Sequence, residues 1–192
     1  MIHTIEGTLT HRGGNFAVVN VGGLGIKVFS HARGISSLPV AGNKIKFFCH
    51  LHVREDALDL FGFTSEEELS FFESLISISG VGPKSALSIF GVDKLENILA
   101  AIKENRPDLL TRASGIGRKT GERIVLELRG KVGSEKSESF VGKMEADSDV
   151  VEALVGLGYR RDQARAALGK IDEKVTGLEE RLKAALKILG GK

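Results

Sequence analysis

The pattern of hydrophobic and polar positions changes near residue 63 and again near residue 133 of this 192-residue chain. Up to residue 63, short apolar or alternating runs are separated by turns rich in glycine and asparagine, which is typical of β-strands. The expected strands cover residues 2–10, 16–21, 26–30, 45–53 and 58–63. Five short strands in so few residues suit a small closed barrel, because closure leaves no exposed sheet edge. We expect an OB-fold barrel over residues 1–63, with an SH3-like barrel as the alternative.

Residues 64–132 have the apolar spacing of helices. Ser65 and Glu68 form a candidate capping box before the first of these helices. Asp93 is a candidate cap for another, and Pro107 suits the first turn of a third. This segment is therefore predicted to be an all-α domain.

Residues 133–147 contain Ser, Glu, Lys and Gly with few apolar residues, so we expect a flexible linker there. Beyond it, residues 148–192 are expected to form a small three-helix module. Its amphipathic helices are predicted at residues 150–157, 162–171 and 178–189. The fold class expected for the whole chain is a multidomain β + α protein.

The composition is that of a soluble globular protein, with 42% hydrophobic and 27% charged residues. No apolar run is long enough for a membrane helix, and the first residues lack the pattern of a signal segment. Cys49 is the single cysteine, which favours a reducing cytoplasm. The net charge is only +2, so any binding of nucleic acid must depend on locally placed donors.

The strongest chemical signal is an internal repeat. Gly80–Ala86 (GVGPKSA) matches Gly115–Gly121 (GIGRKTG), with 35 residues between equivalent positions, and Ser79 matches Ser114. Repeats of this length indicate duplicated supersecondary units. Each copy is predicted to be a helix, a tight Gly-x-Gly turn and a second helix.

Such a turn has the chemistry of a phosphate site. Glycine permits positive φ and close approach of an anion, and the free N–H groups of the following helix favour negative charge. Lys84 and Lys119 add a charge, and Ser85 and Thr120 add a hydroxyl. The expected phosphate-binding residues are Ser79, Gly80, Val81, Gly82, Lys84, Ser85, Gly115, Ile116, Gly117, Arg118, Lys119, Thr120 and Arg123.

Other phosphate motifs fit less well. A P-loop needs contiguous Gly-Lys-Ser/Thr, which Arg118 interrupts, and the helical flanks exclude a dinucleotide fold. We therefore expect no ATP site. The repeat resembles the helix–hairpin–helix motif, which binds the DNA backbone across the minor groove without reading sequence. Ser79 and Ser114 stand where many such hairpins have Pro, and this predicts slightly looser turns.

Taken alone, Arg54-Glu55-Asp56-Ala57 is typical of a solvated turn. The chain as a whole, however, resembles the RuvA family of bacterial Holliday-junction-binding subunits. The resemblance rests on the ordered segments Val21–Gly25, Val53–Ala57, Leu60–Phe63, Gly80–Lys84, Gly115–Thr120 and Leu157–Tyr159.

This resemblance implies a homotetramer, alone or paired into an octamer, that holds a four-way DNA junction open and square-planar. Arg54, Glu55 and Asp56 would form an acidic pin at its centre. The C-terminal, UBA-like module would dock on the hexameric ATPase RuvB through Leu154, Leu157 and Tyr159, although these residues also suit the module's own core. The RuvC resolvase is a further implied partner. No catalytic residue, metal or cofactor is expected.

Two other functions compete with this interpretation. One is an enzyme, either a helix–hairpin–helix DNA glycosylase or a nuclease. A glycosylase of that type would carry a catalytic Asp downstream of the hairpin, whereas Ile124–Lys131 leads into the expected linker with no such Asp. A general OB-fold single-strand binder would use stacking aromatics, yet the chain has no Trp and one Tyr. His50 and His52 have spacing that metal sites also use, but we expect ordinary strand residues. His31 is a candidate for facing DNA.

Overall fold

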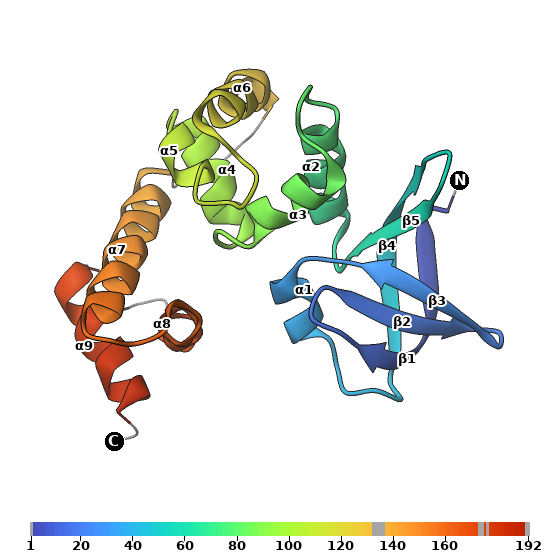
Figure 1. Ribbon diagram of the computed structural model, residues 1–192, viewed down its shortest axis with the longest axis horizontal. Coiled ribbons are helices and arrows are strands. Elements are labelled where there is room, and N and C mark those ends of the chain that lie inside the picture. Colours follow the sequence, from blue (N-terminus) through green and yellow to red (C-terminus); the bar gives the residue numbers. More distant parts are fainter. Residues whose placement is uncertain (1, 132–136, 173–174, 176, 191–192) are drawn as a thin grey trace.

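A computed structural model describes residues 2–131, 137–172, 175 and 177–190 (Figure 1). The N-terminal part is a closed barrel in the order β1-β2-β3-β5-β4. Its strands are β1 (Thr4–Arg12), β2 (Phe16–Val21), β3 (Leu24–Phe29), β4 (Lys44–Val53) and β5 (Leu58–Phe63). The pairings are antiparallel except for the parallel contact of β3 with β5. The predicted OB-type barrel is confirmed.

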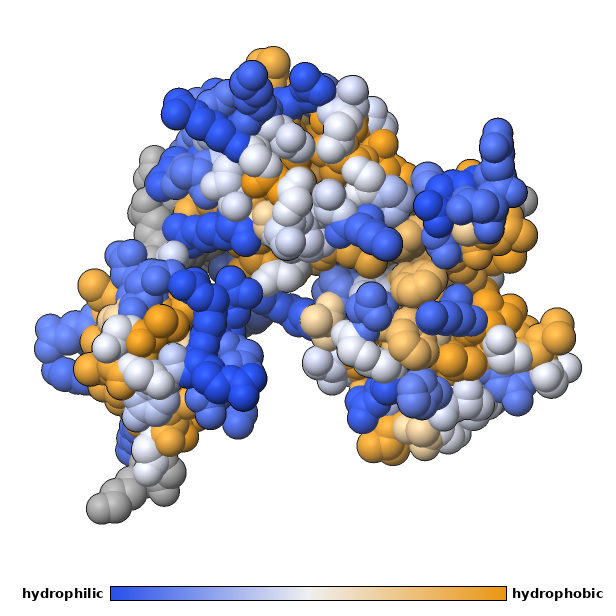
Figure 2. All heavy atoms as spheres, viewed as in Figure 1, coloured by the Kyte–Doolittle hydropathy of each residue, from blue (hydrophilic) through white to orange (hydrophobic). Residues whose placement is uncertain are grey.

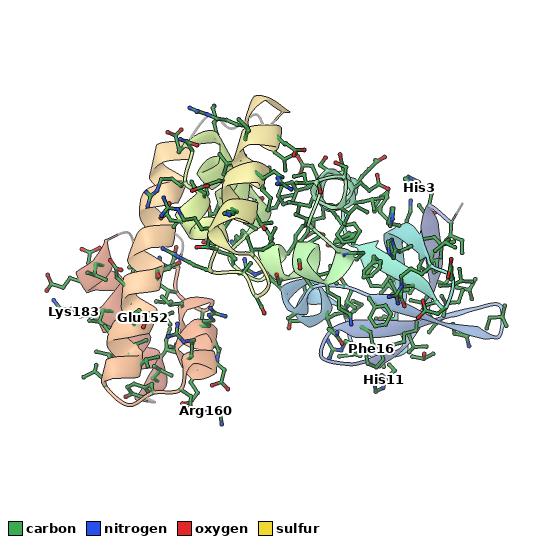
Figure 3. The ribbon with its side chains drawn as sticks, turned by 45° about the horizontal axis from the view of Figure 1, so that its top comes forward. His3, His11, Phe16, Glu152, Arg160 and Lys183 are labelled. Carbon is green, nitrogen blue, oxygen red and sulfur yellow. The ribbon has the colours of Figure 1, made fainter. Side chains whose placement is uncertain are left out.

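Alternate residues of the strands fill the barrel, as the period of two requires. Leu9, Val19, Val28 and Phe47 are fully buried there. Cys49 lies among them, and burial raises the pKa of its thiol to about 11, so the thiol is neutral near pH 7. At the outer end of the β1–β2 hairpin, His11 packs against Phe16 (Figure 3).

A short helix, α1 (Ala32–Ser37), connects β3 to β4 and was not predicted. It is only six residues long, too short to show helical periodicity. His31 is its N-cap, with Nδ1 accepting a hydrogen bond from the Gly34 N–H at 3.0 Å.

His31 does not face DNA, and that expectation is wrong. Its side chain is buried, with its ring stacked on Phe90 at 5.0 Å and lying 6.3 Å from Phe63. Nε2 lies 3.3 Å from Oε1 of Glu68. The residue therefore joins the barrel to the helices that follow, through ring stacking on Phe90 and a carboxylate close to Nε2.

The helical domain continues directly from β5. Its elements are α2 (Glu66–Ile76), α3 (Pro83–Phe90), α4 (Leu95–Lys103), α5 (Pro107–Leu110), α6 (Arg118–Leu128) and the 3-10 turn η1 (Arg129–Lys131). Phe61 and Phe63 of β5 share one hydrophobic cluster with Phe72 and Phe90 of the helices. This shared core fixes the helical domain against the barrel.

The helix starts differ in detail from the predictions. Ser65 caps α2, since its Oγ accepts from the Glu68 N–H at 3.2 Å. The carboxylate of Glu68, however, accepts from the Thr64 N–H at 3.2 Å rather than from Ser65, so the capping box is not closed as expected. Lys94, and not Asp93, is the N-cap of α4. Pro107 stands in the first turn of α5, as predicted.

The C-terminal module consists of α7 (Ser137–Gly156), α8 (Arg161–Leu168) and α9 (Leu178–Leu189). Arg181 is 2% exposed and donates to the Asp147 carboxylate and, at 2.7 Å, to the Val175 carbonyl, which holds α9 against α7. Glu152 on the outside of α7 pairs with Arg161 at 2.7 Å (Figure 3). The predicted three-helix module is confirmed.

The predicted linker needs correction, because α7 begins at Ser137 and includes residues 137–147. Glu, Lys, Met and Ala in this stretch are good helix formers, so a low apolar content did not prevent a helix. The N-terminal part of α7 runs alongside α4 (Figure 1). Residues 133–136 lie outside the described residues.

Candidate nucleic-acid interface

The two Gly-x-Gly turns have nearly the same backbone. Gly80 and Gly115 have φ of +89° and +81°, which side chains other than glycine rarely adopt. Gly82 and Gly117 follow in extended conformation, with φ of −84° and −82°, and are the N-caps of α3 and α6. The predicted duplication of a helix–hairpin–helix unit is confirmed by the matching backbone geometry of the two turns.

The residue between the glycines anchors each turn. Val81 and Ile116 are both 5% exposed and belong to the core of the helical domain. Their N–H groups donate to the carbonyls of Ile78 and Ala113, at 3.0 and 3.2 Å. The turn is therefore fixed from beneath, while its glycines lie at the surface.

The start of each following helix is open to an anion. Neither N-cap glycine can supply a side-chain acceptor, and the first turns of α3 and α6 contain no acidic residue. The first N–H groups and the positive end of each helix dipole therefore have no cap side chain and no first-turn carboxylate to pair with. Pro83 removes one donor from α3, whereas Arg118 keeps the equivalent donor in α6.

The predicted basic residues lie beside these helix starts. Lys84 and Lys119 are exposed, and Ser85 and Thr120 are half-buried. Arg118 is exposed, and its Nε donates to Glu122 at 2.9 Å. Many of the side chains seen over α6 in Figure 2 are hydrophilic. The structure therefore brings charge, hydroxyl and backbone donors together at both turns.

Arg123 has a contact that the sequence did not predict. Its Nη1 donates at 2.7 Å to the carbonyl of Ser79, in the other hairpin. Ser88, which was not among the expected residues, lies 2.7 Å from the Ser114 carbonyl in the same manner. The sequence repeat could have indicated that these two contacts are equivalent. Ser88 and Arg123 are 35 residues apart, and so are Ser79 and Ser114.

The acidic tip is the turn between β4 and β5, which projects from the barrel on the side of the N-terminus (Figure 1). The Arg54 N–H donates to the Ala57 carbonyl at 2.9 Å and closes the turn. Glu55 and Asp56 are exposed, the latter with 82% of its side chain accessible. Arg54 donates through Nη2 to Asp59 at 3.2 Å, so its charge is partly matched within the hairpin.

Two apolar side chains lie just below this tip. Val53 and Leu58 are a cross-strand pair that is 65% and 71% exposed. They continue the inward-facing rows of β4 and β5 past the rim of the barrel, where no barrel core covers them. The projecting tip itself is hydrophilic (Figure 2).

The three residues expected to dock a partner have different positions. Leu154 is fully buried in the core of the module, so its expected place on a docking surface is corrected to a core position. Tyr159 is half-buried against that core. Leu157 is 62% exposed, at the end of α7 next to Gly158, whose φ is +94°. Of the three, Leu157 offers the most accessible apolar surface.

His50 pairs with Glu73, with 3.0 Å between Nδ1 and Oε1. Across the part of the chain that the structure describes, His, Cys, Asp and Glu form no group of three suited to a metal ion. None of the described helices is both long and apolar enough to cross a membrane.

Family models match this architecture along the chain. The model of the RuvA N terminal domain matches residues 1–62, the SAM-like helix-hairpin-helix tandem residues 72–131, and the RuvA C-terminal domain residues 145–190. A protein of Dehalococcoides mccartyi is 40% identical over 194 residues, covering 100% of both chains. One of Thermoanaerobacter sp. is 41% identical over 189 residues, covering 98% of this chain and 99% of its own. Both are named Holliday junction branch migration complex subunit RuvA.

This chain belongs to the RuvA family. A more distant RuvA relative, from Methylibium petroleiphilum, is 37% identical over 98% of this chain. The RuvA models cover the barrel and the three-helix module, and the helix–hairpin–helix model covers both Gly-x-Gly turns. The family resemblance carried by the motifs is therefore confirmed.

Proposed function

We propose that this protein binds four-way DNA junctions as the non-catalytic, DNA-holding subunit of a branch-migration complex in recombination and repair. The observation that carries the proposal is the pair of matching Gly-x-Gly turns, each opening a helix with a lysine beside it. Its support is the full-length similarity to relatives whose names contain this role.

Each turn binds one backbone phosphate. The phosphate approaches the glycine surface, accepts from the first N–H groups of α3 or α6, and pairs with Lys84 or Lys119. No base edge is read by such a contact, so the grip is independent of sequence. A grip of this kind tolerates DNA that moves through the site one base pair at a time.

The acidic tip gives the preference for a junction. In a four-fold tetramer, four copies of Glu55 and Asp56 meet where the arms cross, and Arg54 stands beside them. Their carboxylates repel phosphates and oppose stacking of the arms, so the junction stays open and square-planar. Linear duplex that crosses the same centre is repelled. Attraction at the turns and repulsion at the centre together select four separated arms.

A competition gel-shift tests the proposal directly. A labelled synthetic four-way junction is incubated with the full chain at moderate salt, with either excess linear duplex or excess unlabelled junction as competitor. Unlabelled junction is expected to displace the label, and duplex of the same sequence is expected to fail. Equal displacement by both competitors would refute junction-selective binding.

The C-terminal module is proposed to recruit RuvB, the hexameric ATPase, through the surface around Leu157 and Tyr159. Leu157→Asp is expected to abolish ATP-driven branch migration with RuvB and to leave junction binding unchanged. Leu178→Asp is the matched control, because Leu178 is also exposed (46%) but begins a different helix, α9. Equal activity of both variants would contradict docking at Leu157. We propose in addition that the protein contacts the RuvC resolvase and that two tetramers can pair into an octamer.

A further inference from the structure

The two hairpins contact each other through side chains of their second helices. Ser88 Oγ, on α3, lies 2.7 Å from the carbonyl oxygen of Ser114. Arg123 Nη1, on α6, donates at 2.7 Å to the carbonyl of Ser79. The two acceptor residues, Ser79 and Ser114, directly precede the first glycine of their turns. Each turn is thus held by a side chain from the opposite hairpin.

These contacts are related by the internal repeat. The donors Ser88 and Arg123 occupy equivalent positions, and so do the acceptors Ser79 and Ser114, with 35 residues between the members of each pair. The same two carbonyls are therefore bound reciprocally, although one donor is a hydroxyl and the other a guanidinium. Both helices use the same position to reach across, which ties the two contacts to the symmetry of the hairpin pair.

The bound carbonyls control the geometry of the turns. Each belongs to the peptide group that leads into a glycine of positive φ, so fixing its direction fixes that glycine's backbone. Serine leaves the backbone before this peptide freer than a proline at the same position would. A Cβ on Gly115 would lie 3.0 Å from Ser85 Oγ, so the hairpins are also in close contact there. The cross-contacts supply the stiffness that serine does not.

We propose that Ser88 and Arg123 are positioning residues, each of which locks the phosphate-binding turn of the opposite hairpin. The two phosphate sites of a subunit are then held at a fixed spacing and respond as a unit to substitution. This inference rests on the proposed function, because it assigns the locked turns to DNA phosphates. It predicts that Ser88, which belongs to the first hairpin, affects phosphate binding at the second.

The effect of Ser88 is limited by its geometry. Its Oγ also lies 2.7 Å from the carbonyl of Ser85, and a hydroxyl has one proton to share between both acceptors. We therefore expect Ser88→Ala to weaken junction binding by about three- to tenfold, the range of one modest hydrogen bond. Ser88→Thr retains the hydroxyl and is expected to restore most of the affinity.

A double-mutant cycle in the full chain tests where Ser88 acts. Junction affinity is measured for Ser88→Ala alone and in combination with Lys119→Ala or with Lys84→Ala. If Ser88 positions the second turn, its effect should largely vanish once Lys119 is removed, because that site is already weakened. With Lys84 removed, its effect should persist in full. Arg123→Lys should show the mirror image, coupled to Lys84 and not to Lys119.

The outcomes separate this inference from the proposed function. Binding of Ser88→Ala at the wild-type affinity would overturn the inference, as would equal coupling to Lys84 and Lys119. A loss of affinity that accompanies a lower urea midpoint and that Ser88→Thr does not restore would also overturn it, because Ser88 would then support the fold alone. Failure of the wild-type chain to prefer junction over duplex would instead refute the proposed function.

Discussion

The four turn glycines divide into two pairs that the structure predicts will respond differently to alanine. Gly82 and Gly117 have ordinary negative φ, and an added Cβ would meet no atom within 4 Å. Gly80 and Gly115 have positive φ, which costs an alanine about 1–2 kcal/mol. At Gly115 the new Cβ would also lie 3.0 Å from Ser85 Oγ.

For Gly82→Ala and Gly117→Ala, two opposing contributions to stability nearly cancel. Alanine is a poorer N-cap than glycine, at a cost of about 0.5–1 kcal/mol. It also reduces the conformational freedom of the unfolded chain, which stabilises by about 0.4–1 kcal/mol. The free energy of unfolding is therefore expected to change by less than about 0.5 kcal/mol. Gly115→Ala should destabilise by at least about 1–2 kcal/mol.

DNA binding should follow a different order from stability. A methyl group at Gly82 or Gly117 would stand on the surface that the phosphate is proposed to approach, and would separate the phosphate from the helix N–H groups. Loss of one hydrogen bond to a charged group costs about 1.5–3 kcal/mol, so junction affinity should fall by at least about tenfold.

Urea unfolding followed by circular dichroism and junction gel-shifts on the same preparations provide the two measurements. If Gly117→Ala unfolds like the wild type and also binds the junction equally well, phosphates do not approach these turns. If Gly117→Ala instead unfolds as readily as Gly115→Ala, the backbone reasoning is wrong.

Three other variants examine the remaining charges. Lys84→Ala with Lys119→Ala should lower the slope of log Kd against log salt by about 0.9 for each lost phosphate contact; an unchanged slope would show that neither ammonium binds phosphate. Glu55→Gln with Asp56→Asn should strengthen binding to linear duplex, since the exposed carboxylates no longer repel it, and weaker duplex binding would contradict a repulsive centre. Burial raises the pKa of Glu68, but His31 and Thr64 outweigh it through hydrogen bonds and charge, so the folded pKa lies below its ordinary value of 4.5. Ionised Glu68 therefore stabilises the fold above that pH and stabilises it less as the pH falls. Glu68→Gln should be more destabilising near about pH 7 than near about pH 3 in urea unfolding, and an equal effect would show that the contacts of this carboxylate with His31 and Thr64 do not stabilise the fold.

The elements with strong local signals were predictable from the sequence. Apolar and polar residues alternate along the barrel strands, and the Gly-x-Gly segment occurs twice. The structure confirms both the strands and the two turns. The roles of Lys84, Lys119 and the acidic tip remain predictions. Composition misled at residues 137–147, where few apolar residues indicated a linker although the backbone is helical. Helix propensity does not require apolar residues, and α7 draws its apolar contacts from the later Val150 and Leu154.

Contacts between distant segments were not predictable in the same way. His31 follows a strand and precedes a short helix, and nothing local shows that Phe63 and Phe90 enclose its ring. Leu154 and Leu157 look alike in sequence, but one lies in the core of the module and the other is exposed. Helix phase alone cannot separate them at the end of a helix, where the chain turns away at Gly158.

The charge balance of the chain favours assembly as the source of the proposed junction selectivity. The net charge of +2 provides little long-range attraction, and the proposed phosphate contacts act within about one Debye length, roughly 8 Å at physiological salt. In the proposed function, each subunit holds one stretch of duplex weakly, through its two Gly-x-Gly turns. In the proposed tetramer, a four-way junction engages all four subunits at once and gains from multivalency, whereas a linear duplex engages fewer and must pass the acidic tips. Weak individual contacts also release readily, which sliding requires. A single subunit should therefore bind junction and duplex alike, and selectivity should appear only with the assembled ring.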